Sequence, residues 1–543
     1  MRIGLVFAAV LAVVVGTVRG DGEDLNPLWS AYKAAVEKNL PRTETNVLAR
    51  IEREAVAAGL LPDAVRAFIA RVDAERQLDD SLEDEWLPVL ERRIASAPAM
   101  MRPYLDLYLA NVIRFAEDEE RWDRTRTKLA NEMSPYEKIF KRVLAHADEL
   151  KAEPVAKWTN VLERATMPDS CRPTLYDLAI HDIIGFYGST VPDKTLEKGL
   201  QLFDALIDFH RDDANADALA DATLGRIEYE VGFSELPAAE RRNRLAAAYD
   251  KFVAEFGGRS SVALLALSRR AKLEYERGNR VAARQMALKG VEMDAKDAKG
   301  DPVSVGGKDC RHLAEGIAAP NAHFFVEEIW SEPFPPIKVM YENVKEVHFK
   351  LVPIDHDVLL GRGTDREALQ RFAAQPGAYS WKATLPEADD FGEHEQKVAP
   401  PSEIKPGAYV FVAGLDDVFS DNGQPYFAKV VQVTDLALVC ETDAGGISGT
   451  VFKANPGTRV CGATVELWNA KTVGQGKAAR PAPKVMTTTT DEDGAFAFAA
   501  TGSQVRLRVI NETSELVMPE SAWLHEREDD DERCCERVSV VTD

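Results

Sequence analysis

The chain has 543 residues, of which 45% are hydrophobic, so it can form several cores at roughly 100 to 200 residues per domain. Its 66 Lys and Arg residues against 89 Asp and Glu residues give a formal net charge of −23, and no basic block offsets this acidity. Such a charge disfavours contact with nucleic acid and with anionic membrane surfaces, and it favours a soluble surface.

Residues 1–20 have the pattern of a secretory signal peptide. Arg2 is followed by an uncharged stretch from Ile3 to Val18, and then by Arg19-Gly20-Asp21-Gly22. In a helix this stretch would rise about 24 Å, against a bilayer core of about 30 Å, so it spans a membrane only with strain. We therefore predict export to the periplasm, the cell surface or the medium, with cleavage. The alternative is an uncleaved segment, which would be the only membrane contact of the chain.

Residues 21–300 are predicted to be helical. Leu245, Tyr249, Phe252 and Phe256 recur at spacings that place them on one apolar helix face. Gly278 then ends a helix in the manner of a left-handed cap.

Small residues flank this turn, at Ala271, Ala283 and Gly290, and they would let two paired helices approach closely. The pair resembles a tetratricopeptide unit. Elsewhere the aromatic residues have no fixed period, which indicates an irregular helical-hairpin array. Such an array can provide a peptide-binding groove or act as a spacer, and without a repeated set of exposed polar residues we favour the spacer.

A linker is predicted at 301–336, where Pro and Gly are dense. Beyond it, apolar residues alternate along 337–341, 347–351 and 409–413, which is typical of antiparallel strands with one buried face. Asn422-Gly423 favours a hairpin turn.

Four further alternating runs predict a second unit, so we expect two antiparallel β-sandwiches after the helices. Their predicted bounds are 337–440 and 441–525. The remaining residues, 526–543, form an acidic link and a final strand that would begin a further, incomplete domain.

Six cysteines over this length are too sparse for a disulfide scaffold. We predict one disulfide, between Cys440 and Cys461, because both flank the start of the second sandwich. The adjacent Cys534-Cys535 and nearby His525 make an incomplete zinc set.

No residue is predicted to be catalytic, to bind a cofactor or to hold a metal. Asp355-His356-Asp357 is interpreted as a turn at a strand end, since alternation separates the imidazole from both carboxylates. Asp491-Glu492-Asp493-Gly494 lacks the distal ligands of a calcium loop and is interpreted as a hairpin turn. The motifs of serine hydrolases, zinc proteases and nucleotide-binding proteins are missing from the sequence, so we predict that the chain is not an enzyme.

Several segments carry a resemblance to a known family. Residues 335–351 resemble the opening of the first macroglobulin domain of bacterial alpha-2-macroglobulin-like proteins, and 405–412 and 431–439 look like its closing strands. The segment 449–498 is similar to carboxypeptidase-regulatory-like and other macroglobulin-type sandwiches. The resemblance covers the N-terminal portion of that family.

The resemblance implies an exported, non-enzymatic protein that contributes to protease trapping without a cofactor. It also implies that the bait region, the thioester domain and the receptor-type domain are missing. The family's thioester needs a Cys two residues before Glu-Gln. Here Glu393 precedes His394-Glu395-Gln396 instead, and we interpret this string as a solvent loop.

The partners implied by the resemblance are proteins, either proteases or a separately encoded remainder of the array. The alternative is an extracytoplasmic scaffold or protein-binding module that uses the helical region.

Overall fold

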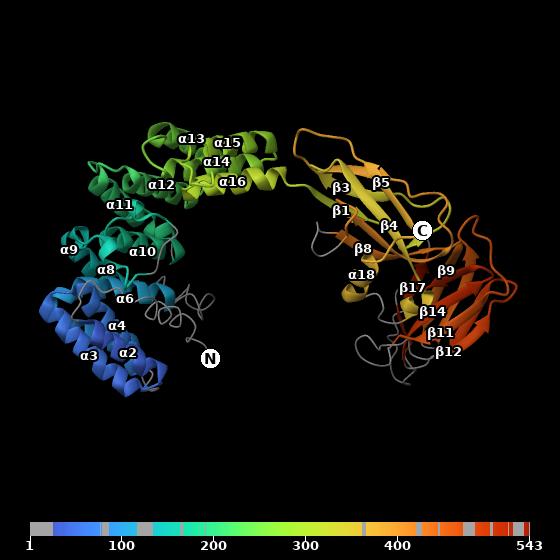
Figure 1. The fold of residues 1–543 in the computed structure, drawn as a ribbon, viewed down its shortest axis with the longest axis horizontal. Coiled ribbons are helices and arrows are strands. Elements are labelled where there is room, and N and C mark those ends of the chain that lie inside the picture. The colour runs from blue at the N-terminus through green and yellow to red at the C-terminus, as the bar shows by residue number, and fades with distance from the viewer. Residues whose placement is uncertain are drawn as a thin grey trace. The chain divides into compact units, whose positions relative to one another are not determined.

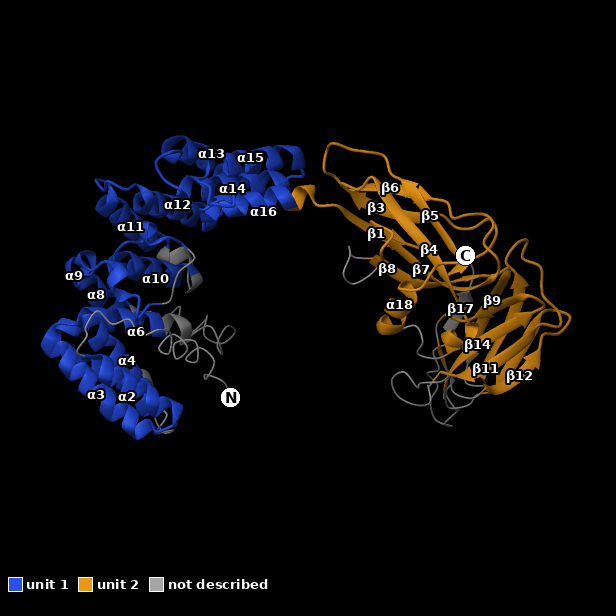
Figure 2. Ribbon diagram, viewed as in Figure 1, with its two compact units in different colours: residues 1–315 blue, residues 316–543 orange. Residues whose placement is uncertain are grey.

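The protein consists of two compact units, Met1–Glu315 and Gly316–Asp543 (Figure 2). The computed structural model describes residues 25–76, 78, 86–116, 134–162, 167–190, 192–360, 365–419, 426–443, 446–470, 484–499, 503–519, 521–524 and 537–541. The predicted signal peptide, His525 and Cys534-Cys535 lie outside these residues. Within them, no helix is both long and apolar enough to cross a membrane.

Unit 1 is an array of helices, each packed against its neighbours in the chain (Figure 1). Its α-helices are α2 (Asn26–Glu37), α3 (Pro41–Ala58), α4 (Leu61–Arg76), α5 (Trp86–Ser96), α6 (Arg102–Ala116), α8 (Ser134–Ala145), α9 (Ala147–Ala152), α10 (Leu175–Thr190), α11 (Pro192–His210), α12 (Asp217–Gly232), α13 (Ala238–Phe256), α14 (Val262–Glu276), α15 (Arg280–Met293) and α16 (Val305–Ala318). Short 3₁₀ turns lie at η3 (Ala99–Met101), η4 (Val155–Trp158) and η5 (Asp169–Cys171).

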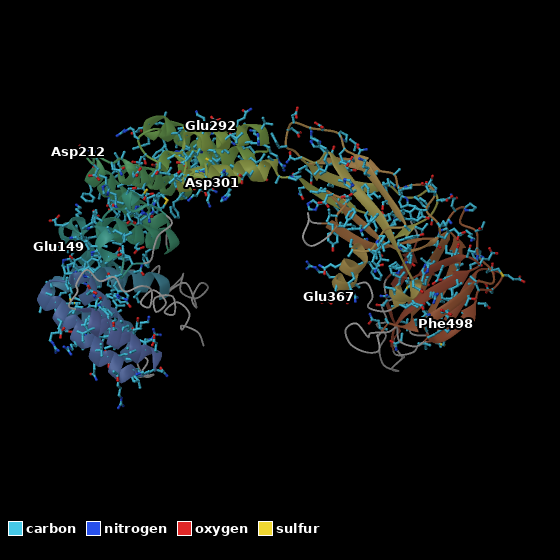
Figure 3. All side chains as sticks on the ribbon, viewed as in Figure 1. Glu149, Asp212, Glu292, Asp301, Glu367 and Phe498 are labelled. Atoms are coloured by element: carbon cyan, nitrogen blue, oxygen red, sulfur yellow. The ribbon has the colours of Figure 1, made fainter. Side chains whose placement is uncertain are left out.

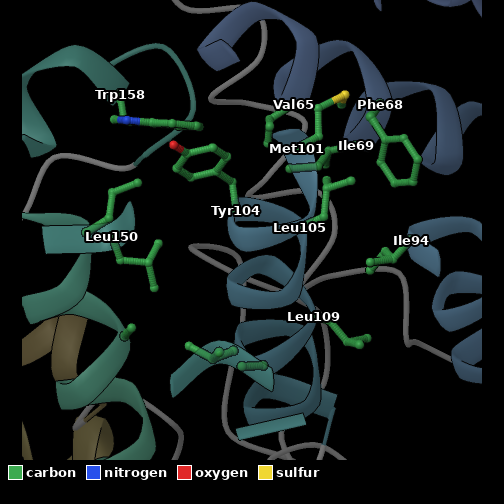
Figure 4. Close-up of a cluster of buried hydrophobic side chains, with 14 of the residues drawn as sticks. Val65, Phe68, Ile69, Ile94, Met101, Tyr104, Leu105, Leu109, Leu150 and Trp158 are labelled. Atoms are coloured by element: carbon green, nitrogen blue, oxygen red, sulfur yellow. The ribbon is translucent and has the colours of Figure 1, made fainter. Parts of the chain in front are cut away.

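The core of the first half of unit 1 forms around α4 and α6 (Figure 4). Tyr104 of α6 packs against Trp158 with ring centroids 4.5 Å apart, and both rings are buried. α4 is buried on nearly all sides, so its charged residues need partners. Asp63 accepts a hydrogen bond of 3.0 Å from the Trp29 indole, and the Arg66 guanidinium lies over the same ring.

The predicted helix-glycine-helix pair corresponds to α14 and α15. Gly278 between them has a φ of +84°, a conformation that favours glycine. Ala271, Ala283 and Gly290 are buried where the helices meet, as the small residues predicted. A side chain at Gly290 would also overlap Cys310 of α16, so the small residues serve a third helix that the sequence did not predict.

That third helix lies inside the predicted linker, and the linker prediction is corrected here. Residues 301–336 contain α16 and two short strands. Gly306 and Gly307 were interpreted as helix breakers. In the structure a Cβ at Gly306 would overlap the backbone of Leu264 and Leu265, and one at Gly307 would overlap Asp294. The two glycines therefore allow close helix packing.

Unit 2 contains two β-sandwiches (Figure 1). In the first, the strand orders are β1-β3-β6 and β2-β8-β7-β4-β5. The bounds are β1 (Asn321–Phe325), β2 (Ile329–Trp330), β3 (Ile337–Glu342), β4 (Glu346–Ile354), β5 (Tyr379–Thr384), β6 (His394–Val398), β7 (Gly407–Gly414) and β8 (Tyr426–Val433), with helices α17 (His356–Leu360) and α18 (Arg366–Ala373). Strand pairings within each sheet are antiparallel except that of β2 with β8. Trp330, Phe349 and Phe411 fill the core.

The second sandwich has the strand orders β13-β10-β9-β17 and β12-β11-β14-β15, with β16 also on β14. The bounds are β9 (Leu436–Asp443), β10 (Gly446–Lys453), β11 (Thr464–Asn469), β12 (Lys484–Thr489), β13 (Ala495–Ala499), β14 (Ser503–Asn511), β15 (Ser514–Val517), β16 (Ala522–Leu524) and β17 (Arg537–Val541). The predicted fold class, a helical array followed by two antiparallel sandwiches, is thus confirmed.

The sandwich bounds differ from the predicted ones. β9 pairs with β10, so the strand that the sequence assigned to the end of the first sandwich belongs to the second. The final strand β17 pairs antiparallel with β9, with Ser539 opposite Cys440. In the structure it is an edge strand of the second sandwich, hydrogen-bonded along β9.

Two predicted loops also need comment. Residues 394–398 form the edge strand β6 on β3, where backbone pairing with β3 overrides their polarity, so the solvent-loop prediction was wrong. Residues 421–423 lie outside the described residues, but β7 and β8 on either side of them pair as a hairpin.

Charge is carried on the surfaces of both units. The acidic side chains labelled in Figure 3, among them Glu149 and Asp212 in unit 1 and Glu367 in unit 2, project from the ribbon into solvent. This agrees with the soluble surface expected from the net charge of −23.

Candidate functional site

The most elaborate set of side-chain contacts in unit 2 lies where its two sandwiches meet. Its centre is a small apolar cluster in which Leu359 and Leu360 of α17, Ala408 of β7 and Val517 of β15 are all buried. Partly buried side chains surround it, namely Ile354, Val430 and Trp468. The two sandwiches therefore share a continuous apolar contact.

Gln432 of β8 fastens β15 of the second sandwich. Its side-chain amide donates to the Val517 carbonyl at 2.7 Å, and its amide oxygen accepts from the Val517 N–H at 2.8 Å. The residue is 3% exposed. Because Val431 and Val433 point into the first core, alternation turns Gln432 outward toward the second sandwich. The amide thus completes the hydrogen bonding of a backbone group that would otherwise be buried without partners.

Arg508 of β14 ties α17 to the same sheet. Its guanidinium bonds Asp357 at 2.9 Å and lies 2.5 Å from the Glu515 carboxylate, while Glu466 lies 3.9 Å away. Burial alone would lower the pKa of Arg508, but the hydrogen bond and charge of Glu515 and the other carboxylates raise it above its ordinary value. The cation is therefore stabilised in the charged form at the junction.

His356 begins α17 at the same place. Its Nδ1 lies 3.5 Å from Glu515. Burial lowers the pKa of His356, and the nearby positive charge of Arg508 lowers it further. The negative charge of Glu515 opposes these two effects and does not outweigh them. Asp355 accepts a hydrogen bond from the Asp357 N–H, so the triplet forms the turn predicted at the end of β4, and this turn leads into α17.

The two cysteines of the predicted disulfide lie in different environments. Cys440 on β9 is buried with its thiol 3.8 Å from the Met518 sulfur, whereas Cys461 is exposed, and both are free in the structure. The pairing is therefore not formed, because Cys440 points into the core and Cys461 toward solvent. Burial raises the pKa of Cys440 to about 11, which keeps this thiol protonated at neutral pH.

The acidic string near residue 493 forms a turn. Asp491 accepts hydrogen bonds from the N–H groups of Asp493 and Ala495, and Gly494 has a φ of +71°. The turn joins β12 to β13, which belong to different sheets, so it crosses between sheets and is not the hairpin that was predicted. Across the described residues, no three His, Cys, Asp or Glu side chains are grouped so as to hold a metal ion.

Unit 1 contains a second buried polar cluster, around two histidines. His210 contacts Asp177 through Nε2 at 2.6 Å and Asp213 through Nδ1 at 2.7 Å. Burial alone would lower the pKa of His210, but the hydrogen bonds and charges of these carboxylates raise it. Both ring nitrogens face acceptors, so the geometry favours the imidazolium form.

His181 on the preceding helix shows the opposite behaviour. It lies 3.4 Å from Asp221, which also accepts a hydrogen bond from Arg172. Burial, with a further contribution from the Arg172 charge, lowers the pKa of His181 to about 4. Two buried histidines of one cluster therefore have opposite preferred charge states.

Sequence reasoning did not single out Gln432, Arg508 or His210. The sequence did carry one signal for Gln432, which lies between two valines on β8. A polar residue at such an outward strand position faces either solvent or a hydrogen-bonding partner. The alternating arginines of β14 are equally compatible with a solvated strand face, and nothing in the sequence shows which outer face is covered by another domain.

No protein-family model matches this chain, and no curated protein matches it. The structure comparison finds alpha-2-macroglobulin from Escherichia coli spanning domains NIE-MG1, at 16% identity and a TM-score of 0.29, covering 37% of this chain and 97% of that one. It also finds the same protein spanning MG0-NIE-MG1, at 15% identity and a TM-score of 0.29, with 37% of this chain and 63% of that chain covered.

A third similar structure is a mutant of Salmonella alpha-2-macroglobulin, at 16% identity and a TM-score of 0.27. There 37% of this chain matches, and it spans 12% of the Salmonella chain. The family that the sequence resembles is thus also the family of these similar structures, namely the N-terminal portion of bacterial alpha-2-macroglobulins.

Proposed function

We propose that this chain is an exported, non-enzymatic, alpha-2-macroglobulin-like protein that contributes to protease inhibition. In this proposal the β unit acts as a stiff module that holds other parts of a protease trap at a fixed separation. The supporting observation is the junction, where Gln432 joins the two sandwiches through a buried hydrogen bond and Arg508 adds an ion pair to Asp357 at the surface. A stiff pair of sandwiches suits a structural part of a large assembly.

The proposed contribution depends on parts that these 543 residues do not contain. A thioester requires Cys two residues before Glu-Gln, and the sequence has Glu393 at that position. In the structure this string lies at β6, an edge strand. In this proposal, covalent capture of a protease is left to parts outside these 543 residues, in the same polypeptide or in a partner chain.

Inhibition by the chain itself can be tested with purified full-length protein and an endoprotease. A trap that encloses a protease slows the digestion of a large protein substrate and spares the cleavage of a short chromogenic peptide. If the large substrate is protected selectively at molar excess of the chain, the proposal stands for this chain alone. If neither substrate is protected, this chain alone is not an inhibitor, and the contribution requires its partner.

Export is tested separately by fractionating cells that express the full-length chain. We expect the protein outside the cytoplasm, with an N-terminus near residue 21 by mass spectrometry. Protein that stays in the cytoplasm with residues 1–20 intact would remove the extracytoplasmic part of the proposal.

A second candidate function is a protein-binding scaffold, and one observation favours it. α15 and the end of α14 carry large apolar side chains that are 38–43% exposed, namely Tyr275, Val281, Leu288 and Met293. Val281 and Leu288 are seven residues apart, which places them on one helix face. Exposed apolar groups gathered in this way are typical of contact surfaces.

The two candidates are separated by a double variant, Val281→Glu with Leu288→Glu. If the helical array grips a protease or another partner, this variant loses the protection or the complex. Leu40→Glu is the matched control, since Leu40 is 45% exposed in another part of unit 1. Equal behaviour of both variants would leave the array as a spacer.

A further inference from the structure

Unit 2 contains a cavity of about 250 Å³ beside the junction of its sandwiches. The walls come from both sandwiches. Leu359 and Leu369 on the helices of the first and Val517, Met518 and Pro519 after β14 of the second are apolar, and polar or charged side chains complete the lining, namely Glu328, Lys429, Gln432 and Arg506. The volume equals that of about eight waters at ~30 Å³ each. It is therefore large enough for a small organic molecule.

One charged group at this cavity lacks a counter-charge. Arg506 of β14 donates from Nη1 to the Leu359 carbonyl at the end of α17, and its Nε is buried without a hydrogen-bond partner. No carboxylate among the described residues forms an ion pair with it. Burial also lowers the pKa of this guanidinium.

The contrast with Arg508 shows how unusual this is. Both arginines lie on the same face of β14, two residues apart, and both reach toward α17. Arg508 has Asp357, Glu515 and Glu466 around it. Arg506 is partly buried and has no such partner among the described residues, and removing a cation from water without a counter-charge is costly unless an anion binds to it.

The other polar groups of the cavity are already engaged. Lys429 pairs with Glu328 at 3.0 Å, so their charges offset each other. The amide nitrogen and oxygen of Gln432 are both hydrogen-bonded to the Val517 backbone. The guanidinium of Arg506 is thus the group left to bind a ligand.

The free edge of Arg506 defines the chemistry of that ligand. With Nη1 engaged and Nε enclosed, Nη2 remains to donate a charge-assisted hydrogen bond to an oxygen of a carboxylate. The apolar side chains of the lining suit an apolar body, and the only other cation of the lining, Lys429, is already paired with Glu328. We propose that the cavity binds a monocarboxylate with a compact apolar body, held by Arg506. This chemistry is shared by a free short-chain or arylalkyl acid and by the C-terminal residue of a peptide that ends in an apolar side chain.

The proposal goes beyond the proposed function and does not depend on it. It is tested on the full-length chain by isothermal titration calorimetry with 3-phenylpropionate, hexanoate and a short peptide ending in leucine. Each probe has a matched neutral form, the primary amide for the acids and the C-terminal amide for the peptide. We expect the carboxylate of at least one probe to bind at least tenfold more tightly than its amide. Binding of the peptide but not of the free acids assigns the site to a chain terminus, and the reverse assigns it to a small molecule.

Arg506→Met removes the charge while keeping the length of the side chain, and we expect it to abolish the preference for carboxylate over amide. The variant should remain folded, since removing an uncompensated buried charge is often neutral or stabilising. Arg459→Met is the control, because Arg459 is an exposed arginine paired with Asp493 and distant from the cavity lining. If the variant at Arg506 does not fold, the comparison of each acid with its amide on the unaltered chain decides alone.

Two results would overturn the proposal. One is binding of every probe and its amide with equal affinity, or of none of them. The other is an undiminished carboxylate preference in folded Arg506→Met.

Discussion

The two units differ in the sequence separation of the residues whose contacts stabilise them. In the helical unit, Asp177 and His210 of neighbouring helices are 33 residues apart, Trp29 and Asp63 of α2 and α4 are 34 apart, and Asn111 and Asp182 are 71 apart. In the β unit, Gln432 reaches Val517 over 85 residues, and Arg508 reaches Asp357 over 151. Contacts between neighbours allow parts of an array to open separately, whereas contacts across sandwiches couple them.

The comparison predicts how each unit responds when a contact is removed. In the helical unit, removing a contact should destabilise only the helices next to it. In the β unit the loss of a junction contact should release two sandwiches at once.

Gln432→Leu should have the largest effect. It leaves the Val517 N–H and carbonyl buried without partners, which costs about 3 to 4 kcal/mol in the free energy of unfolding of the β unit. Chemical denaturation of the full chain, followed by tryptophan fluorescence, measures the loss. Gln375→Leu is the control, because Gln375 is exposed and the change should stay within about 0.5 kcal/mol. Equal effects at both positions would show that the amide clamp contributes nothing.

The histidine cluster should give the helical unit a stability that depends on pH. His181 has a pKa of about 4 when folded and about 6.5 when unfolded, so the unfolded chain binds the proton more tightly. Stability is then lost as the pH falls from about 6.5 to 4, by on the order of 3 kcal/mol. His210 has the opposite sign, since its pKa is raised when folded: its contribution is complete below the unfolded pKa and is lost as the pH rises through the folded pKa.

These two contributions are separated by His181→Gln and His210→Gln, with far-UV circular dichroism reporting the helices. His181→Gln should flatten the acid side of the stability profile, and His210→Gln should flatten the side above it. A profile that neither variant changes would mean that both histidines titrate normally in the folded protein.

Gly306→Ala should destabilise the packing of α16 by about 2 kcal/mol, since its Cβ would overlap the backbone of Leu264 and Leu265. The matched control lies in the same helix. Gly316 has no atom within 4 Å of its Cβ position, so Gly316→Ala should be neutral or stabilise by up to about 1 kcal/mol. Thermal unfolding measures both, and the account of α16 fails if the two variants behave alike.

Arg459→Ala should have the smallest effect. Its partner Asp493 and Arg459 itself are 78% and 58% exposed, and exposed pairs contribute about 0 to 1 kcal/mol. The same measurement on Arg508→Ala, whose partners Glu466 and Glu515 are largely buried, should show a clearly larger loss. A comparable loss for both arginines would place the stability of the β unit outside its junction.

Much of the fold was readable from local patterns. Apolar spacing at Tyr249, Phe252 and Phe256 and alternation at Ile337, Val339 and Tyr341 each report on one element and its buried face. Gly306 and Gly307 misled because a glycine suits a turn and a tight helix contact equally well, and only the neighbouring helix decides between them.

The junction could not be predicted for a related reason. Gln432, Arg506 and Arg508 lie on outer strand faces, which are solvated in a single sandwich and covered only when a second sandwich is present. The strand β17 was likewise recognised as a strand, but its pairing with β9 depends on residues about a hundred positions earlier. Element type follows from nearby sequence, whereas partners across domains do not.

The coupling of the two sandwiches is tested most directly by native-state hydrogen exchange of the full-length chain, read by mass spectrometry. Amides of β4 and β7 report on the first sandwich, and those of β11 and β14 report on the second. We predict that the most protected amides of both sandwiches exchange with the same free energy and respond equally to denaturant, while helices at the two ends of unit 1 differ. Two distinct exchange free energies for the two sandwiches would contradict the account.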